Sequence, residues 1–230
     1  MERSIYLNGT YIRQNPTYHT EDSLWKAQQV LKMLNRHPLP IQTVCEVGCG
    51  AGEILLHLQR HMPPETLFYG YDVSPQAYEL CKQHTNERLT YYCEDLLNKD
   101  TPPFDLLLCL DVLEHVEDYM GFLRKLRGKA RYKIFHIPLD LSVQTVLRSV
   151  PILRARERVG HLHYFTKETA LLTLRDTGYE VLDYFYTPTV EQGKALIFKL
   201  MKLPRAVLMS LNADLTVRIL GGHSLLVLAR

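Results

Sequence analysis

Short apolar runs alternate with amphipathic stretches along most of this 230-residue chain. A helical pattern over residues 24 to about 36 comes first, and Pro38 and Pro40 end it. Strand-like runs follow at residues 44–47, 67–72, 91–96, 104–110 and 133–137, separated by helical patterns. The run 104–110 is apolar almost throughout, as in a central strand that is buried on both faces. This alternation predicts a doubly wound α/β fold, with a mostly parallel sheet and helices on both faces.

The first predicted strand ends in a glycine-rich turn, Glu46-Val47-Gly48-Cys49-Gly50-Ala51-Gly52, and a helical pattern follows at once. Glycine permits a positive φ and leaves room for a ligand, and a helix N-terminus adds backbone N–H donors. Asp72 closes the next strand, where its carboxylate can accept hydrogen bonds from both hydroxyls of a ribose. These positions predict a nucleoside cofactor.

The glycine spacing excludes two common nucleotide sites. A dinucleotide-binding turn reads G-x-G-x-x-G, but Glu53 occupies the place of the third glycine here. The G-K-[ST] sequence of a phosphate-binding loop is absent from the chain. Ligands of a doubly wound sheet lie at the carboxyl ends of its strands. Four candidate residues are expected at such ends: Gly48, Asp72, Asp95 and Asp111.

The pattern Glu-x-Gly-x-Gly-x-Gly at 46–52 resembles motif I of class I S-adenosylmethionine-dependent methyltransferases. Residues 111–118 look like the LEHV signature of small-molecule and quinone-type methyltransferases, and residues 160–166 are similar to their HxHxFT stretch. The resemblance covers about residues 41–230. It implies a Rossmann-like sheet of seven strands with an antiparallel last strand. It also implies S-adenosylmethionine as the cofactor and methyl transfer to oxygen or nitrogen of a small molecule.

Carried over residue by residue, the resemblance implies a set of cofactor-binding positions. In the family, the residue that matches Asp95 meets the adenine amino group, and the one that matches Leu96 offers a backbone N–H to the ring. The full set is Glu46, Gly48, Cys49, Gly50, Gly52, Asp72, Val73, Asp95, Leu96, Leu110 and Asp111.

His115 is the candidate catalytic base, because it follows the fourth predicted strand, where the acceptor should approach. An imidazole titrates near neutral pH, which suits a base. A structural histidine that hydrogen-bonds to backbone or caps the next helix is an alternative. His161 and His163 are candidate substrate contacts, and their alternation along an extended segment lets only one face the crevice. Tyr11 and Tyr18 are candidates for a lid over the site. The remaining histidines are interpreted as surface or packing residues: His19, His37, His57, His61, His84, His136 and His223.

Two other functions stay open. Asp111, Glu114 and His115, with His161 or His163, resemble the metal ligands of small-RNA terminal 2′-O-methyltransferases. However, an aspartate replaces the first glutamate of that set, and the net charge of +2 comes with no concentrated basic segment. We therefore expect no metal and no nucleic-acid partner. The second alternative is a cofactor-binding protein of the same fold without turnover.

The chain divides into an N-terminal helical cap or lid at 1–40 and a methyltransferase domain at 41–230, with insertions at about 139–160 and 189–220. Both insertions combine apolar and basic residues, which is typical of ordinary covering helices. The same composition also suits a lipid-like or anionic substrate or a membrane surface.

Composition adds little to this picture. Hydrophobic residues make up 46% of the chain, as in an ordinary globular domain. The five cysteines contain no C-x-x-C pair and are interpreted as buried, reduced thiols. Because we find neither a signal-like start nor an apolar run long enough for a membrane span, we expect a cytoplasmic protein. The oligomeric state is left open.

Overall fold

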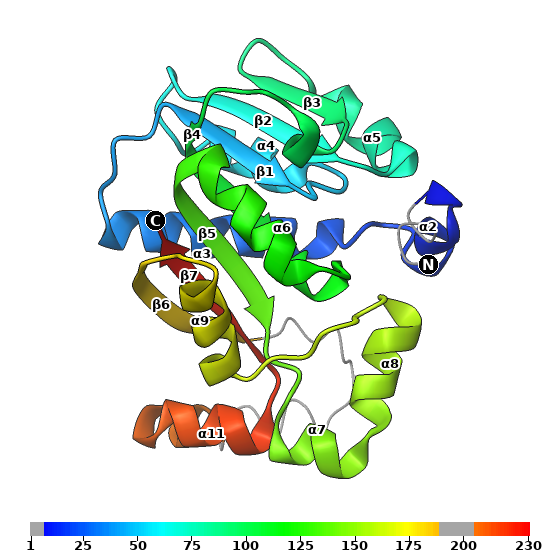
Figure 1. Cartoon of the computed structure of the whole chain (residues 1–230), viewed down its shortest axis with the longest axis vertical. Helices are drawn as coiled ribbons and strands as arrows, with labels where there is room; N and C mark the ends of the chain where they lie inside the picture. The colour runs from blue at the N-terminus through cyan, green and yellow to red at the C-terminus, as the bar shows by residue number, and fades with distance from the viewer. Residues whose placement is uncertain (1–6, 189–204) are drawn as a thin grey trace.

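A single seven-stranded sheet forms the centre of the computed structural model, which describes residues 7–188 and 205–230 (Figure 1). The strand order is β3-β2-β1-β4-β5-β7-β6. The strands are β1 (Thr43–Val47), β2 (Leu67–Asp72), β3 (Leu89–Cys93), β4 (Phe104–Leu110), β5 (Ala130–Pro138), β6 (Val181–Pro188) and β7 (His223–Ala229). The first five are parallel, and β7 runs antiparallel to both of its neighbours. The predicted fold is confirmed.

Helices cover both faces of the sheet because side chains of each strand alternate between them. Leu106 and Leu108 of β4 pack towards one face, together with Val30 of α3 and Leu55 of α4. Leu107 packs towards the other, with residues of α6 and α9. The helices are α2 (Thr10–Gln14), α3 (Ser23–Arg36), α4 (Glu53–Gln59), α5 (Pro75–Cys81), α6 (Tyr119–Leu126), α7 (Val143–Arg148), α8 (Val150–Arg158), α9 (Lys167–Asp176) and α11 (Ala213–Leu220).

Helix α3 is one of the helices that pack against a face of the sheet. Its residues Ala27, Val30 and Met33 are buried in the same core cluster as Val44 of β1. The predicted N-terminal cap therefore contacts the sheet through α3. The boundary at residue 40 stays a prediction.

Two details differ from the expected elements. The third strand ends at Cys93, before the acidic pair, because Asp95 leaves the sheet and its carboxylate accepts the Leu97 N–H at 3.0 Å. That bond caps the short helical turn Leu96–Asn98. Four cysteines are buried as interpreted, but Cys93 is exposed at the end of β3, an edge strand.

The two predicted insertions differ in what the structure describes. The first forms α7 and α8, which lie with α11 beyond the carboxyl end of β5, at the lower end of Figure 1. Of the second, residues 189–204 lie outside the described residues, residues 205–211 are helical, and α11 follows. None of the helices in the described ranges combines the length and apolarity needed to cross a membrane.

Candidate active site

A cavity of about 1160 Å³ opens at the carboxyl ends of the parallel strands. This volume exceeds the roughly 300–1,000 Å³ of most small-molecule sites, so it has room for more than one ligand. All eleven residues predicted to bind the cofactor line it, as do His115, His161, Tyr11 and Tyr18. The residues that the switch-point rule singled out therefore line one cavity.

The glycine-rich turn is built to keep side chains out of the cavity. Gly48 has a φ of +70°, and a Cβ there would lie 2.6 Å from a methyl group of Val112. The backbone N–H groups of Gly48 and Cys49 donate to the Tyr71 carbonyl at 2.8 and 3.1 Å. Gly50 has a φ of +54°, and the nearest atom that a Cβ there would meet belongs to Tyr18, at 3.6 Å. The turn thus forms a cradle that a nucleoside can enter.

Asp72 is fixed by the turn that it faces. Its two carboxylate oxygens accept the Gly50 N–H at 2.9 Å and the Ser74 N–H at 2.8 Å. Burial raises the pKa of Asp72, and these backbone hydrogen bonds offset part of that rise. Each oxygen keeps a further lone pair, so the carboxylate can still accept hydrogen bonds from the hydroxyl groups of a ribose. Tyr18 completes this end through a 2.9 Å hydrogen bond between its hydroxyl and that of Ser74.

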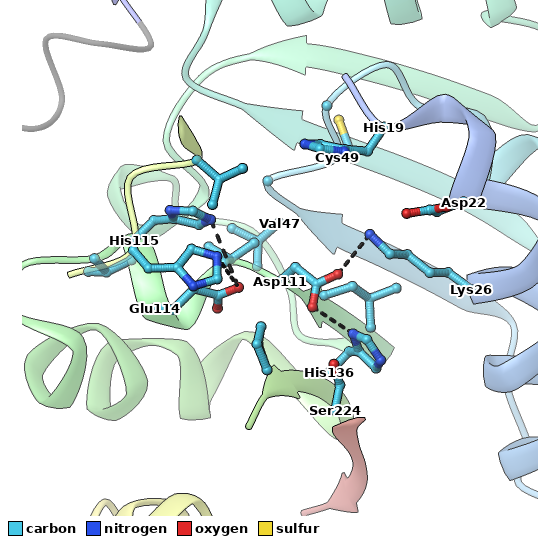
Figure 2. Close-up of a pocket in the computed structure, with 18 of the residues that line it drawn as sticks. His19, Asp22, Lys26, Val47, Cys49, Asp111, Glu114, His115, His136 and Ser224 are labelled. Atoms are coloured by element: carbon cyan, nitrogen blue, oxygen red, sulfur yellow. Dashed lines mark hydrogen bonds and ion pairs between the residues drawn. The ribbon is translucent and has the colours of Figure 1, made fainter. Parts of the chain in front are cut away.

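A chain of polar contacts surrounds Asp111, which directly follows β4 (Figure 2). One carboxylate oxygen lies 2.6 Å from Nδ1 of His136, and the other lies 2.7 Å from Nζ of Lys26. Nε2 of His136 continues the chain to the Thr187 hydroxyl at 2.8 Å. Burial alone would raise the pKa of Asp111, but His136 and Lys26 together hold it far below its ordinary value. Asp111 is therefore a carboxylate, with the unusual φ of +53°.

Sequence reasoning did not single out Lys26 or three of the histidines that line the cavity. His19, His136 and His223 line the cavity, although they were interpreted as surface or packing residues. The sequence did hold a signal for His136, since it lies near the carboxyl end of the strand after Asp111. In the sheet it is the register partner of Leu110. Lys26 comes from α3, which has no local motif.

A second group of side chains meets around Glu114, and Figure 2 shows two imidazoles that face it. Glu114 is fully buried, and neither of its carboxylate oxygens has a hydrogen-bond partner in the part of the chain that the structure describes. Burial and the nearby Asp111 raise the pKa of Glu114 well above its ordinary value. Nε2 of His115 and Nε2 of His161 each lie 3.9 Å from the same oxygen. Ligand atoms of the three residues lie within 4.8 Å of one another, a spacing that a cation could bridge.

The proton of His115 can be placed from its partners. Nδ1 lies 3.2 Å from the Gly160 carbonyl, which only accepts, so Nδ1 carries the hydrogen and Nε2 keeps its lone pair. Burial and the neighbouring His161 lower the pKa of His115 to about 4. His115 is thus a neutral imidazole at pH 7, able to accept a proton or to bind a cation through Nε2.

His161 and His163 point in different directions. Nδ1 of His161 lies 2.7 Å from the Asp140 carboxylate, inside the cavity lining. His163 is not among the lining residues: its Nε2 lies 3.1 Å from the Glu117 carbonyl and its ring packs on Tyr119. Only one of the pair faces the crevice, as their alternation predicts, and the predicted substrate contact of His163 is not brought to the site.

Comparisons with known proteins agree with this geometry. A family model described as a methyltransferase domain matches residues 19–184. The ubiquinone biosynthesis O-methyltransferase of Coxiella burnetii is 34% identical over 114 residues, which are 46% of this chain and 47% of that protein. Its counterpart from Idiomarina loihiensis is 28% identical over 150 residues, which are 59% and 60% of the two chains. The chain thus spans about half the length of the curated relatives that it matches.

Solved structures share the fold at low sequence identity. Magnesium protoporphyrin IX methyltransferase from Synechocystis, with bound S-adenosylhomocysteine, has a TM-score of 0.61 and 19% identity, covering 90% of this chain and 82% of that one. An N-methyltransferase from Bradyrhizobium japonicum, in complex with the same compound, has a TM-score of 0.60 and 18% identity, covering 96% and 97%. Since the family model matches most of its length, the chain belongs to the methyltransferase-domain family of class I S-adenosylmethionine-dependent enzymes.

Proposed function

We propose that this chain transfers a methyl group from S-adenosylmethionine to a hydroxyl oxygen of a small-molecule acceptor. The observation that carries the proposal is the shared cavity, in which the cofactor cradle and the neutral imidazole of His115 belong to one lining. A hydroxyl needs help with its proton, whereas a neutral amine needs little. An acceptor nitrogen is therefore the less favoured form of the proposal.

We propose a task for five of the residues that line the cofactor end of the cavity. The turn at Gly48 and Gly50 would hold the methionine portion, Asp72 the ribose hydroxyls, and Asp95 with Leu96 the adenine. When bound, the cofactor supplies a methyl group activated on a sulfonium. The remaining work of the protein is to align the acceptor oxygen and exclude water, because an in-line displacement depends mainly on orientation.

His115 would take the proton of the acceptor hydroxyl through Nε2. With a pKa of about 4 it is neutral at pH 7, but it is a weak base. A phenol has a pKa of about 10 and is therefore a better partner for such a base than an alcohol. The names of the curated relatives, which are O-methyltransferases, support an oxygen acceptor.

Transfer of labelled methyl groups into fractionated cell extract tests the proposal. We expect label in small-molecule or organic-soluble fractions with the unmodified protein, and none with Asp72→Ala. Asp100→Ala is the matched control, because Asp100 is exposed and is not a lining residue. Label that nuclease destroys would indicate an RNA acceptor. If no fraction gains label although S-adenosylhomocysteine binds, the chain is a non-catalytic cofactor-binding protein.

A second candidate keeps the methyl transfer and adds a divalent cation. The observation in its favour is the group of Glu114, His115 and His161, whose mixed carboxylate and imidazole ligands suit such an ion. The ion would orient the acceptor oxygen and assist its deprotonation. Metal analysis of the purified protein, with Glu114→Gln beside it, separates the candidates. About one ion per chain that Glu114→Gln abolishes supports the cation. If the purified protein holds no metal and chelators do not change its turnover, the result supports His115 as the base without a cation.

We also infer that the outer face of α7 and α8 rests on an anionic membrane surface. Leu147 of α7 is 80% exposed, and Leu153 of α8 is also exposed. Arg156 and Arg158 are exposed on α8 beside them and would complement anionic headgroups. Exposed large hydrophobic residues are concentrated on α7, α8, the helical residues 205–211 and α11, which together form the insertion region. Ten of the fifteen such residues in the described ranges lie there: Val143, Val146, Leu147, Val150, Leu153, Val207, Leu208, Leu211, Leu215 and Ile219.

Co-sedimentation with phosphatidylglycerol vesicles tests this contact. We expect binding at low salt that falls with salt, and loss of binding in Leu147→Asp with Leu153→Asp. Leu172→Asp is the control, since Leu172 is exposed on α9, outside this region. No binding at low salt, together with a dimer by light scattering, would assign the face to a second copy instead. A cytoplasmic location stays a prediction.

A further inference from the structure

The cavity is basic at the end opposite the cofactor cradle. Arg148 of α7, Arg154 of α8 and Arg205, which lies before α11, all line it there. Among the described lining residues beyond position 137, Asp140 is the only carboxylate, and it lies 2.7 Å from His161. The three arginines therefore form a distinct positive region of the lining.

These arginines have no carboxylate partner within the described residues. Lys26 is paired with Asp111, and Arg36, Arg218 and Arg230 also form ion pairs elsewhere in the structure. No such pair involves Arg148, Arg154 or Arg205 in the ranges 7–188 and 205–230. A positive region without internal neutralisation attracts anions into a cleft.

Arg205 is held in place by backbone, not by charge. Its Nη2 donates to the carbonyls of Leu220, at 3.1 Å, and Gly221. Gly222 has a φ of +68°, and a Cβ at this position would come within 2.7 Å of the same nitrogen. Nε of Arg205 is buried, and no atom of the described residues accepts its hydrogen. The guanidinium is thus fixed by backbone carbonyls, and no carboxylate of the described residues neutralises its charge.

Helix α8 separates its arginines by direction. All three arginines of α8 are exposed, but Arg154 lines the cavity with Pro151, one turn earlier, whereas Arg156 and Arg158 do not line it. Arg148 is the last residue of α7, whose start is fixed by a capping box between Ser142 and Thr145. The cavity-facing arginines are therefore placed by defined helices and are distinct from those of the outer face.

We propose that Arg148, Arg154 and Arg205 form a subsite for an anionic group of the methyl acceptor, a carboxylate or a phosphate ester. The planar guanidinium fork suits both, because it can donate two parallel hydrogen bonds to such a group. This inference rests on the proposed function, since it assumes that the acceptor shares the cavity with the cofactor. The anion would lie at the arginines and the reacting hydroxyl towards His115.

Isothermal titration calorimetry on the full chain, saturated with S-adenosylhomocysteine, tests the subsite. The probes are protocatechuate, its alcohol analogue in which the carboxylate is replaced by a hydroxymethyl group, and phenyl phosphate. We expect protocatechuate to bind about tenfold tighter than the alcohol, or ~1.4 kcal/mol. The double variant Arg148→Gln with Arg154→Gln should reduce this advantage below about threefold. Phenyl phosphate, compared with protocatechuate, indicates whether the subsite prefers phosphate or carboxylate.

The matched control is Arg156→Gln with Arg158→Gln, which removes two charges from the same helix outside the cavity. Retention of the advantage in this control supports the subsite. Equal loss in both double variants, or equal binding of acid and alcohol to the unmodified chain, would overturn it. Methyl transfer is measured separately. An anion preference that depends on Arg148 and Arg154 without any transfer would defeat the proposed function but not the subsite.

Discussion

At the scale of single residues, Asp111 shows how this site is held together. Its positive φ is a conformation that a residue with a side chain adopts at some cost. Lys26 and His136 bind its two oxygens, and its own N–H donates to the His136 carbonyl at 3.0 Å. Residues from α3 and β5 thus stabilise the carboxylate that directly follows β4.

Replacing Lys26 by methionine tests this anchoring. The change leaves the Asp111 carboxylate charged but without its lysine partner. Because both side chains are mostly buried, this loss destabilises the fold. We expect a loss of about 2 kcal/mol in unfolding free energy, which lowers Tm by roughly 4–8 °C. Thermal unfolding followed by circular dichroism measures it. The double variant Lys26→Met with Asp111→Asn should recover at least half of the loss, and an additive loss would contradict the anchoring.

Lys133 of β5 gives a prediction about pH. It is 3% exposed and lies 5.6 Å from the centre of the Tyr179 ring. Burial and the charge of Arg127 lower the pKa of Lys133 to about 8, from 10.5 in the unfolded chain. The folded state therefore favours the neutral amine. The contribution of Lys133 to the stability of the fold is therefore complete at pH values above the unfolded pKa of 10.5. It is lost as the pH falls through the folded pKa of about 8.

Lys133→Met should consequently stabilise the chain at pH 7, where the buried amine is charged. We expect a gain of about 1 kcal/mol, or roughly 2–4 °C in Tm, that shrinks towards zero by about pH 10. Parallel melting curves of both proteins from pH 7 to pH 10 measure the difference. A difference that does not change with pH would mean that the effect comes from packing and not from the charge.

Single residues were predicted from sequence only where a motif marks them. The glycines of the turn, Asp72 and His115 follow strand ends in recognisable patterns, and all of them line the cavity. Lys26 and His136 carry no such mark. They reach Asp111 through the packing of α3 and the pairing of β4 with β5, which a pattern of apolar residues does not reveal.

At the scale of elements, N-terminal capping contributes to the stability of α7 and α9. Both α7 and α9 begin with a capping box, formed by Ser142 with Thr145 and by Thr166 with Thr169. In each, two hydroxyl groups satisfy backbone N–H groups that the helix leaves free. The six-residue α7 depends on this more than α9, because it buries none of its residues.

Ser142→Ala should loosen α7 selectively. Losing an N-cap hydroxyl costs about 1 kcal/mol, or roughly 2–4 °C in Tm. Hydrogen exchange should quicken in residues 143–148 and remain unchanged in α9. Thr166→Ala is the counterpart, with a similar loss in Tm and faster exchange in residues 167–176. Faster exchange across the whole sheet in Ser142→Ala would mean that α7 does not open alone.

Strand bounds show how far an apolar pattern predicts an element. The runs predicted for β2 and β4 have the same bounds in the structure, because polar residues or turns close them at both ends. The third strand was predicted too far towards Leu96. There the side chain of Asp95 accepts a backbone N–H and starts a helical turn, an outcome that depends on local hydrogen bonds and not on the apolar pattern.

At the scale of the whole molecule, the cavity has two ends, which we propose to hold the cofactor and the acceptor. The turn after β1 and the ends of β2 and β3 line the cofactor end, whereas α7, α8 and the turn before β7 line the other. Alternation of β and α segments was enough to predict this architecture. It could not predict the acceptor end, because that part depends on how two insertions pack beyond the sheet.

Cofactor binding should therefore slow hydrogen exchange at one end of the cavity only. S-adenosylhomocysteine at a hundred times its Kd should stabilise the fold by about 2.7 kcal/mol, or roughly 5–10 °C in Tm. Hydrogen exchange should slow in residues 48–52, 72–74 and 94–97 and remain unchanged in residues 143–158. Slower exchange in α7 and α8 would instead show that the two ends respond together.

The order of strands has a consequence for synthesis on the ribosome. In the described sheet, β6 pairs only with β7, and β7 lies between β5 and β6. As the chain emerges, β6 has no strand to join, and β5 keeps an open edge, until β7 has left the exit tunnel. Unpaired edges of this kind attract other chains. The nascent protein thus carries an unpaired β6 and the open edge of β5 through the interval between β6 and β7, a period in which chaperones would have most to protect.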